Sequence, residues 1–197
     1  MLNANLLELG RIVYQQLSFN NGLENIYEQL NILYGAPYKS KFFTESNNGL
    51  PLIRIRDLKT GTHQFNTKER TGKDVIVDKG DLLIGMDAEF HPTLWNGETS
   101  LLNQRVLKVK AKNKVNILYY YYALKPKMMF FENSKAGTTV IHLGKKDIDQ
   151  IKLIRLNQKD EVKINNLFSP IWSKIVNNYC ENKQLTILKD TLLNKYF

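Results

Sequence analysis

The last part of the chain, residues 163–197, carries apolar residues at the spacing of an amphipathic helix. They return every three or four positions, apart from one polar gap between residues 177 and 184. The gap is rich in asparagine, and polar residues on a coiled-coil seam lower stability while fixing register and partner. The apolar face therefore predicts a second helix alongside.

Residues 3–19 show a weak repeat of this pattern. At an offset of 179 the aligned pairs are Leu6 and Leu185, Leu9 and Leu188, and Val13 and Leu192. Two interpretations stay open: any two amphipathic helices align somewhere, or one helical module flanks a central domain on both sides. On the second interpretation, the residues expected at a partner or dimer interface are Leu6, Leu9, Val13, Ile171, Ile175, Leu185, Leu188 and Leu192.

Between these segments, residues 24–157 alternate between short apolar runs and polar turns, which predicts strands. The strands are expected at residues 26–34, 51–56, 75–77, 82–84, 107–109 and 140–143. Alternation in the run 51–56 places Ile53 and Ile55 on one face, with Arg54 and Arg56 on the other. Residues 57–74 are too rich in turn formers for a core element, and the tyrosines at 119–122 are expected to pack rather than stack on bases.

The fold class expected is α+β. A globular domain of mixed sheet and helices occupies residues 24–157. It lies between an N-terminal helix at 1–23 and a long, coiled-coil-forming helix at 158–197. A chain of 197 residues with 43% hydrophobic residues can bury such a core.

Composition and charge limit the kinds of partner that the chain can bind. The opening segment lacks the charged start and apolar centre of a signal peptide, and no apolar run reaches membrane-spanning length. We therefore expect a cytoplasmic protein without a membrane partner. The formal net charge is +9, and residues 99–157 hold twelve basic but three acidic side chains. Such a region suits a polyanion such as nucleic acid, with a solvated basic surface as the alternative.

Candidate nucleic-acid contacts lie in the basic loops and strands of the central domain. Arg54 and Arg56 can grip phosphates or read guanine, or they can pair with acids on a neighbouring strand. Residues 134–139 combine small residues, two threonines and a lysine, which suits phosphate contact, with a plain turn as the alternative. The expected phosphate contacts are Lys39, Lys41, Lys135, Thr138 and Thr139. The expected base contacts are Arg54, Arg56, His63, Arg70, Asn96 and Arg105.

No catalytic or metal motif accompanies these residues. The chain has no glycine pattern for a dinucleotide or a P-loop, and no amino-methyltransferase signature. Its three histidines lie far apart without ligand spacing, so no metal site is expected. The single cysteine, Cys180, can form no internal disulfide and is expected to pack on the helix. We therefore expect a chain that is not an enzyme.

Several short segments follow one another in a recognisable order and span nearly the whole chain. They are residues 34–40 with Phe43, residues 49–58 (Gly-Leu-Pro-Leu-Ile-Arg-Ile-Arg-Asp-Leu), residues 79–84, Asn103, residues 136–139, and the closing helix with 188–189, 192–193 and Phe197. In this order and spacing they resemble a half-length specificity subunit of a type I restriction-modification system.

The resemblance implies a target-recognition domain on a coiled-coil spacer that docks methyltransferase (modification) subunits. In that family two such domains each read half of a split, double-stranded DNA target. This chain has one, so we expect a homodimer that reads a palindromic split site. Partner subunits would carry S-adenosylmethionine, ATP and Mg²⁺, and the restriction motor would join through the complex. This chain would bind no cofactor itself.

The chain also departs from the family pattern. Pro170 falls inside the helical pattern and is expected to kink the helix or mark a restart after Ser169. Where the family has Leu-Pro and Glu-Gln at the start of the final helix, this chain has Leu156-Asn157 and Glu161-Val162. The resemblance therefore supports methyltransferase docking less strongly than it supports DNA binding. The alternatives are a non-catalytic interaction or antirestriction protein that occupies methyltransferase partners, and a silent specificity cassette.

Overall fold

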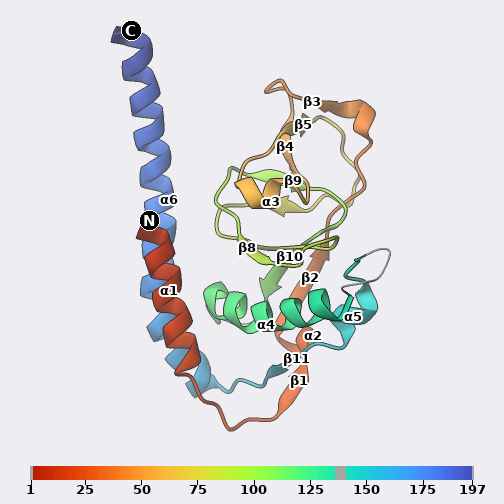
Figure 1. The fold of residues 1–197 in the computed structure, drawn as a ribbon, viewed down its shortest axis with the longest axis vertical. Coiled ribbons are helices and arrows are strands. Elements are labelled where there is room, and N and C mark those ends of the chain that lie inside the picture. Colours follow the sequence, from red (N-terminus) through yellow and green to blue (C-terminus); the bar gives the residue numbers. More distant parts are fainter. Residues whose placement is uncertain (1, 136–140, 197) are drawn as a thin grey trace.

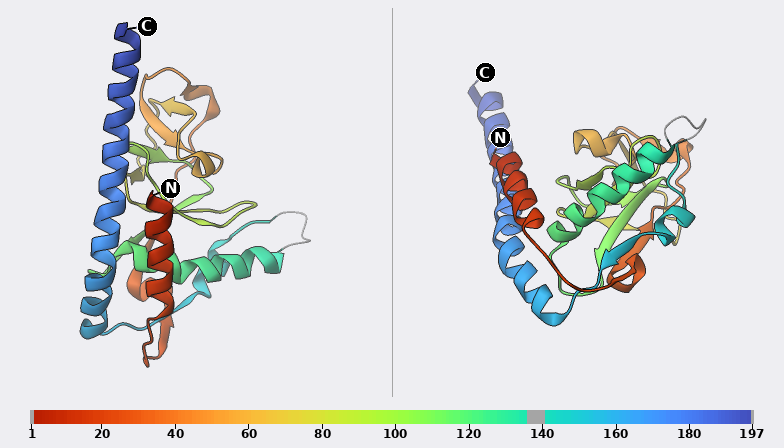
Figure 2. Two further views of the ribbon diagram at one scale, coloured as in Figure 1. Left: turned by 60° about the vertical axis from the view of Figure 1, so that its left-hand side comes forward. Right: turned by 60° about the horizontal axis from the view of Figure 1, so that its bottom comes forward.

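The computed structural model describes residues 2–135 and 141–196. A long helix, α6 (Gln158–Tyr196), lies beside a shorter one, α1 (Leu2–Gln15), and a compact mixed domain is joined to the end where α1 finishes and α6 begins (Figure 1; Figure 2). Sheets and helices in the domain, with a helix at each end of the chain, confirm the α+β class.

The two terminal helices pair because each buries an apolar face. The buried face of α6 contains Ile164, Phe168, Ile171 and Ile175. Amides add fixed contacts, since the Asn3 side chain donates to the Ile175 carbonyl (3.3 Å) and the Asn178 side chain donates to Asn3 (2.7 Å). An asparagine from the predicted polar gap therefore helps to set the register of this pair.

Helix α6 runs through Pro170 without interruption, so the predicted restart after Ser169 is wrong. Proline lacks the N–H that would bond the carbonyl four residues earlier, at Asn166. Both residues are exposed, so water can satisfy that carbonyl. Beyond residue 180 the helix extends past α1, and its described side chains are exposed (Figure 1). Cys180 is exposed as well, which corrects the expectation that it packs.

The larger core of the domain lies between a sheet and two helices. The strands β2 (Leu30–Tyr34), β10 (Val106–Ala111), β7 (Leu82–Gly85) and β8 (Pro92–Leu94) pair antiparallel in that order. Their apolar side chains share one cluster with α4 (Ile117–Lys135) and the inner face of α6. Tyr119, Tyr120 and Tyr122 are buried in this cluster and Tyr121 is half-buried, so the tyrosine run packs as predicted.

A second sheet of five strands forms the far end of the domain (Figure 1). Its order is β3 (Phe43–Thr44), β5 (Phe65–Thr67), β4 (Leu50–Ile53), β9 (Ser100–Leu102) and β6 (Ile76–Val77). Neighbours are antiparallel except β4 and β9, which run parallel with Ile53 opposite Leu102. The carboxyl ends of these two strands therefore meet at one edge of the sheet.

Short elements complete the domain. Strand β1 (Leu23–Asn25) pairs with β11 (Lys152–Ile154) where the chain enters and leaves. The remaining elements are α2 (Ile26–Gln29), the 3₁₀ turn η1 (Ser40–Phe42), α3 (Asp57–Thr60) and α5 (Lys145–Asp149).

Four sequence predictions need correction. The extended run 26–34 begins with the helical turn α2, capped by the Asn25 side chain, which accepts from the Tyr27 N–H. The strand predicted at 51–56 ends at Ile53. Residues 57–74 do supply core elements, α3 and β5. In the described part of 140–143, the chain forms a single β-bridge to Asp87 instead of a strand.

Candidate nucleic-acid interface

Polar residues follow both strands of the parallel pair, at the edge where β4 and β9 end. Arg54 comes directly after β4, and Asn103, Gln104 and Arg105 come directly after β9. The Asn103 N–H donates to the Ile53 carbonyl (2.9 Å), which holds the two strand ends together. We call Arg54, Asn103, Gln104 and Arg105 the strand-end surface.

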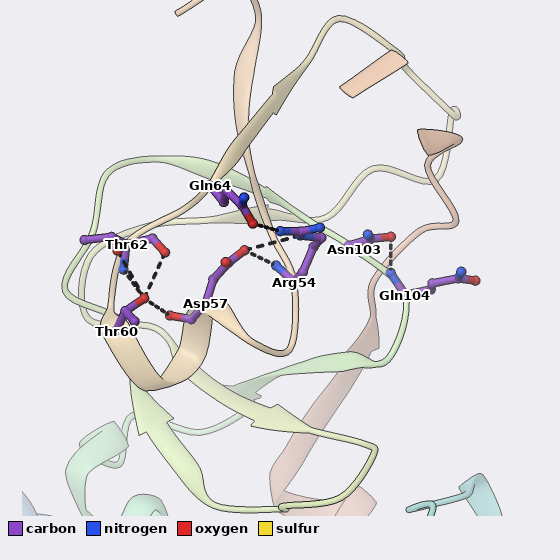
Figure 3. A network of polar contacts seen from close by, with 7 residues as sticks. All are labelled: Arg54, Asp57, Thr60, Thr62, Gln64, Asn103 and Gln104. Carbon is purple, nitrogen blue, oxygen red and sulfur yellow. Dashed lines mark hydrogen bonds and ion pairs between the residues drawn. The ribbon is translucent and has the colours of Figure 1, made fainter. Parts of the chain in front are cut away.

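Arg54 has three partners, of which Figure 3 draws Gln64 and Asp57. Its Nη2 donates to the Gln64 side chain (2.7 Å), its Nε lies 3.8 Å from the Asp57 carboxylate, and its guanidinium lies 4.4 Å from the centre of the Phe65 ring. Burial raises the pKa of Asp57 and lowers the pKa of Arg54, so desolvation outweighs their attraction. Arg54 thus pairs with an acid, on its own turn rather than on a neighbouring strand.

The loop after α3 brings together two further predicted residues. Gly61 ends α3 with a left-handed φ of 70°. A Cβ added there would lie 2.5 Å from the Asn96 side-chain oxygen, so glycine lets the Asn96 loop approach. His63 lies beside it, with Nδ1 3.7 Å from the Glu98 carboxylate.

Arg105 lies in a cluster with Asp87 and His142. Its Nε is 3.8 Å from one Asp87 carboxylate oxygen, and the other oxygen lies 2.6 Å from His142 Nδ1. Arg105 Nη1 lies 3.2 Å from the same His142 nitrogen. The three residues come from the turn after β7, the turn after β9 and the segment before α5, so the cluster joins three separate parts of the chain.

An open cavity of about 380 Å³ connects Arg56 to this cluster. Ile55, Leu58 and Ala88 give it apolar walls, and Arg56 and Asp87 are among its polar lining residues. Arg56 is exposed and makes no ion pair with the described residues, so its charge is available to a ligand.

Lys39 and Arg70 lie around the segment 69–74 and, with Lys41 two residues after Lys39, make up a separate basic group. The Lys39 N–H donates to the Glu69 carboxylate (2.7 Å), and Arg70 Nε lies 4.0 Å from Asp74. Asp74 also accepts from the Tyr38 hydroxyl (2.6 Å), and this bond holds the pKa of Asp74 below its usual value. The ammonium of Lys41 lies 5.0 Å from the Phe42 ring centre.

The remaining predicted phosphate contacts lie elsewhere. Lys135 is in the last turn of α4, with its ammonium 2.9 Å from the Asp147 carboxylate. Thr138 and Thr139 lie outside the described residues.

Sequence reasoning missed the roles of Gln64, Asp87, Gln104 and His142 at this surface. Gln104 is exposed; its backbone N–H donates to the Asn103 side chain (2.8 Å), and its side-chain amide makes no hydrogen bond with the described residues. The only sequence signal was the position of Gln104 and Arg105 shortly after the two apolar residues Leu101 and Leu102. Parallel pairing with β4, which sets Asn103 against the end of β4, is not visible in the sequence.

The predicted helix interface divides into two sets. Ile171 and Ile175 are buried, and Leu6 and Val13 are partly buried against the same core. The exposed set, with 46–55% of each residue accessible, contains Leu9, Leu185, Leu188 and Leu192. The chain therefore uses one half of this apolar pattern internally and leaves the other half uncovered.

The chain thus combines a mixed α+β domain with a long helix and gathers polar residues at one strand edge. The family model "Type I restriction modification DNA specificity domain" matches residues 30–186. The chain belongs to this family.

Two specificity subunits are similar in sequence. The chain is 33% identical to the type I restriction enzyme EcoBI specificity subunit of Escherichia coli, over 68% of this chain and 30% of that protein. It is 28% identical to the MjaVIII specificity subunit of Methanocaldococcus jannaschii, over 64% of this chain and 30% of that protein. The chain thus matches less than a third of the length of either relative.

The fold is also found in a solved specificity subunit. The HsdS subunit from Thermoanaerobacter tengcongensis superposes with a TM-score of 0.58 at 16% identity, covering 98% of this chain and 52% of that one. Within residues 2–135 and 141–196, no helix is long and apolar enough to cross a bilayer. The same ranges contain no cluster of His, Cys, Asp or Glu that could hold a metal ion.

Proposed function

We propose that this chain binds double-stranded DNA sequence-specifically and reads one half of a bipartite target, without catalysing a reaction. The proposal rests on the strand-end surface. Arginine suits guanine and glutamine suits adenine in the major groove, and two strand ends offer both side chains together with Arg54. The family supports DNA as the ligand.

Affinity and specificity would come from different residues. Lys39 and Lys41 are exposed and make no ion pair with the described residues, so they suit the phosphate backbone. Arg54, Arg56 and Arg105 lie at or beside the strand-end surface and are assigned to bases. His63 and Asn96, beside the loop after α3, and Arg70, in the separate basic group, are assigned to bases as well. Lys135, Thr138 and Thr139 remain assigned to phosphate.

The exposed part of α6 would supply the assembly surface. Leu185, Leu188 and Leu192 follow one another at helical spacing on a segment that α1 does not cover. We assign this face to a second copy, so that two recognition domains read the two halves of a palindromic split site. Methyltransferase subunits would dock on the helices and bring the restriction motor, and those subunits would hold S-adenosylmethionine, ATP and Mg²⁺.

The test is enrichment of a random duplex pool by this chain co-expressed with a type I modification subunit. A split, palindromic consensus is the expected result. Retention of the modification subunit without any enriched sequence would favour a protein that merely occupies the partner. Loss of both partner and DNA would refute the proposal for this chain.

A further inference from the structure

Asp87 lies between two residues whose backbone is strained. Among the described residues, the left-handed region is occupied by two that are not glycine: Ala88, which follows Asp87, and Arg105, which pairs with it (φ of 64° and 72°). Such a conformation costs about 1–3 kcal/mol for a residue with a side chain and is found most often at functional sites. Both instances fall within one cluster here.

Backbone bonds hold the strained segments in place. The Met86 N–H donates to the Arg105 carbonyl (2.8 Å), and the Leu143 N–H donates to the Met86 carbonyl (2.7 Å). The Ala88 N–H donates to the Ile141 carbonyl (3.1 Å). Residues 86–88 therefore lie between the Arg105 turn and the His142 segment, and they fix the distance between the two.

The side chains then fix the guanidinium. At 2.6 Å from Asp87, His142 Nδ1 donates its proton to the carboxylate and cannot also accept from Arg105. Arg105 Nη1 lies 3.2 and 3.4 Å from the two ring nitrogens, so the guanidinium lies against the imidazole. Its Nη2 makes no hydrogen bond with the described residues, and about half of the side chain is exposed (54%).

We infer that Asp87 and His142 are positioning residues that hold Arg105 in the orientation in which it reads one base, a guanine. A carboxylate beside Nε and a ring against Nη1 remove rotamer freedom from a side chain that presents a fork to guanine O6 and N7. An ordinary exposed ion pair would need neither a strained backbone nor a third residue. The inference rests on the proposed function.

The test compares Asp87→Asn, His142→Ala and Arg105→Ala with the unchanged chain, each co-expressed with a type I modification subunit. Binding to single-base-pair variants of the enriched site gives the discrimination at each position. All three variants are expected to lose about 5- to 150-fold at the same base pair and to keep their preferences elsewhere. Asp87→Glu should recover part of the loss.

Glu8→Gln serves as the control, because it removes a comparable exposed carboxylate–arginine pair on α1. Glu8→Gln should leave the discrimination at every base pair of the site unchanged. Thermal melting checks that each variant folds. If Asp87→Asn does not fold, His142→Ala alone tests whether Arg105 is held in position by its neighbours. Two outcomes would overturn the inference: a uniform loss of affinity for all duplexes, or unchanged discrimination at the Arg105 base pair. The proposed function would still stand in that case, provided that the unchanged chain enriched a consensus. Absence of any consensus would overturn both.

Discussion

Replacing Arg105 by glycine should separate its role in recognition from its role in the fold. The left-handed backbone at φ 72° costs a residue with a side chain about 1–3 kcal/mol, which glycine avoids. Glycine loses about 0.5–1 kcal/mol in backbone entropy. The exposed contacts to Asp87 are worth about 0–1 kcal/mol. The free energy of unfolding of Arg105→Gly should therefore lie between about 1 kcal/mol below and about 2.5 kcal/mol above that of the unchanged chain.

Arg105→Ala is the matched variant, because it loses the same guanidinium but keeps the strained backbone. It should be less stable than Arg105→Gly by about 1 kcal/mol. Both variants should lose about 1–3 kcal/mol of discrimination at one base pair. Denaturant unfolding followed by circular dichroism measures the first quantity, and competition between duplexes measures the second.

Two results would refute the reasoning. An alanine variant more stable than the glycine variant would show that residue 105 is not left-handed in solution. A glycine variant less stable than the unchanged chain by more than about 2 kcal/mol would make Arg105 a structural residue.

Three further predictions concern other parts of the chain. Tyr38→Phe removes the donor to Asp74 and should cost about 1 kcal/mol at pH 7. The fold lowers the pKa of Asp74 from 3.8, so this stabilisation is present above that pH and is lost as the pH falls below it. Unfolding of both proteins at pH 7 and pH 3 should therefore show that their difference in stability is smaller at pH 3. Leu188→Glu should abolish dimers in sedimentation without changing the monomer's melting, whereas Lys183→Glu on the opposite face should not. Lys39→Ala should weaken binding to all duplexes alike and reduce the slope of log affinity against log salt by about 1, and a sequence-dependent loss would contradict the phosphate assignment.

The helices and several strands follow from local patterns. The spacing of apolar residues from Ile164 onward predicts α6 because a helix repeats every 3.6 residues. Leu107 and Val109 alternate with two lysines, which predicts β10 because side chains in a strand point alternately to its two faces. The predicted strand at 51–56 fails after Ile53, where the Asp57 carboxylate accepts the Arg54 N–H (2.8 Å) and turns the chain into α3. The alternation of apolar and polar residues carries no information about this side-chain bond, so it does not predict where the strand ends.

The candidate surface could be predicted in its residue types but not in its arrangement. Arg54 and Arg105 were both expected to contact bases, yet the segments that carry them meet through the bond between the Asn103 N–H and the Ile53 carbonyl. Such pairing is set by the whole sheet and leaves no short-range signal in either segment. The same holds for Asp87 and His142, whose backbones meet in a single bridge.

The charges of the predicted contacts point to a division of labour. Arg54, Arg70 and Arg105 each lie within 4.0 Å of a carboxylate, so much of their charge is already balanced in the free protein. A paired arginine gains little from counterion release but is oriented before DNA arrives, which favours reading a base. Lys39 and Lys41 keep long, exposed side chains with no carboxylate partner in the part of the chain that the structure describes. Lysines of this kind follow the phosphate backbone whatever its sequence, so they should set affinity. The arginines assigned to bases, which are ion-paired except for Arg56, should set specificity.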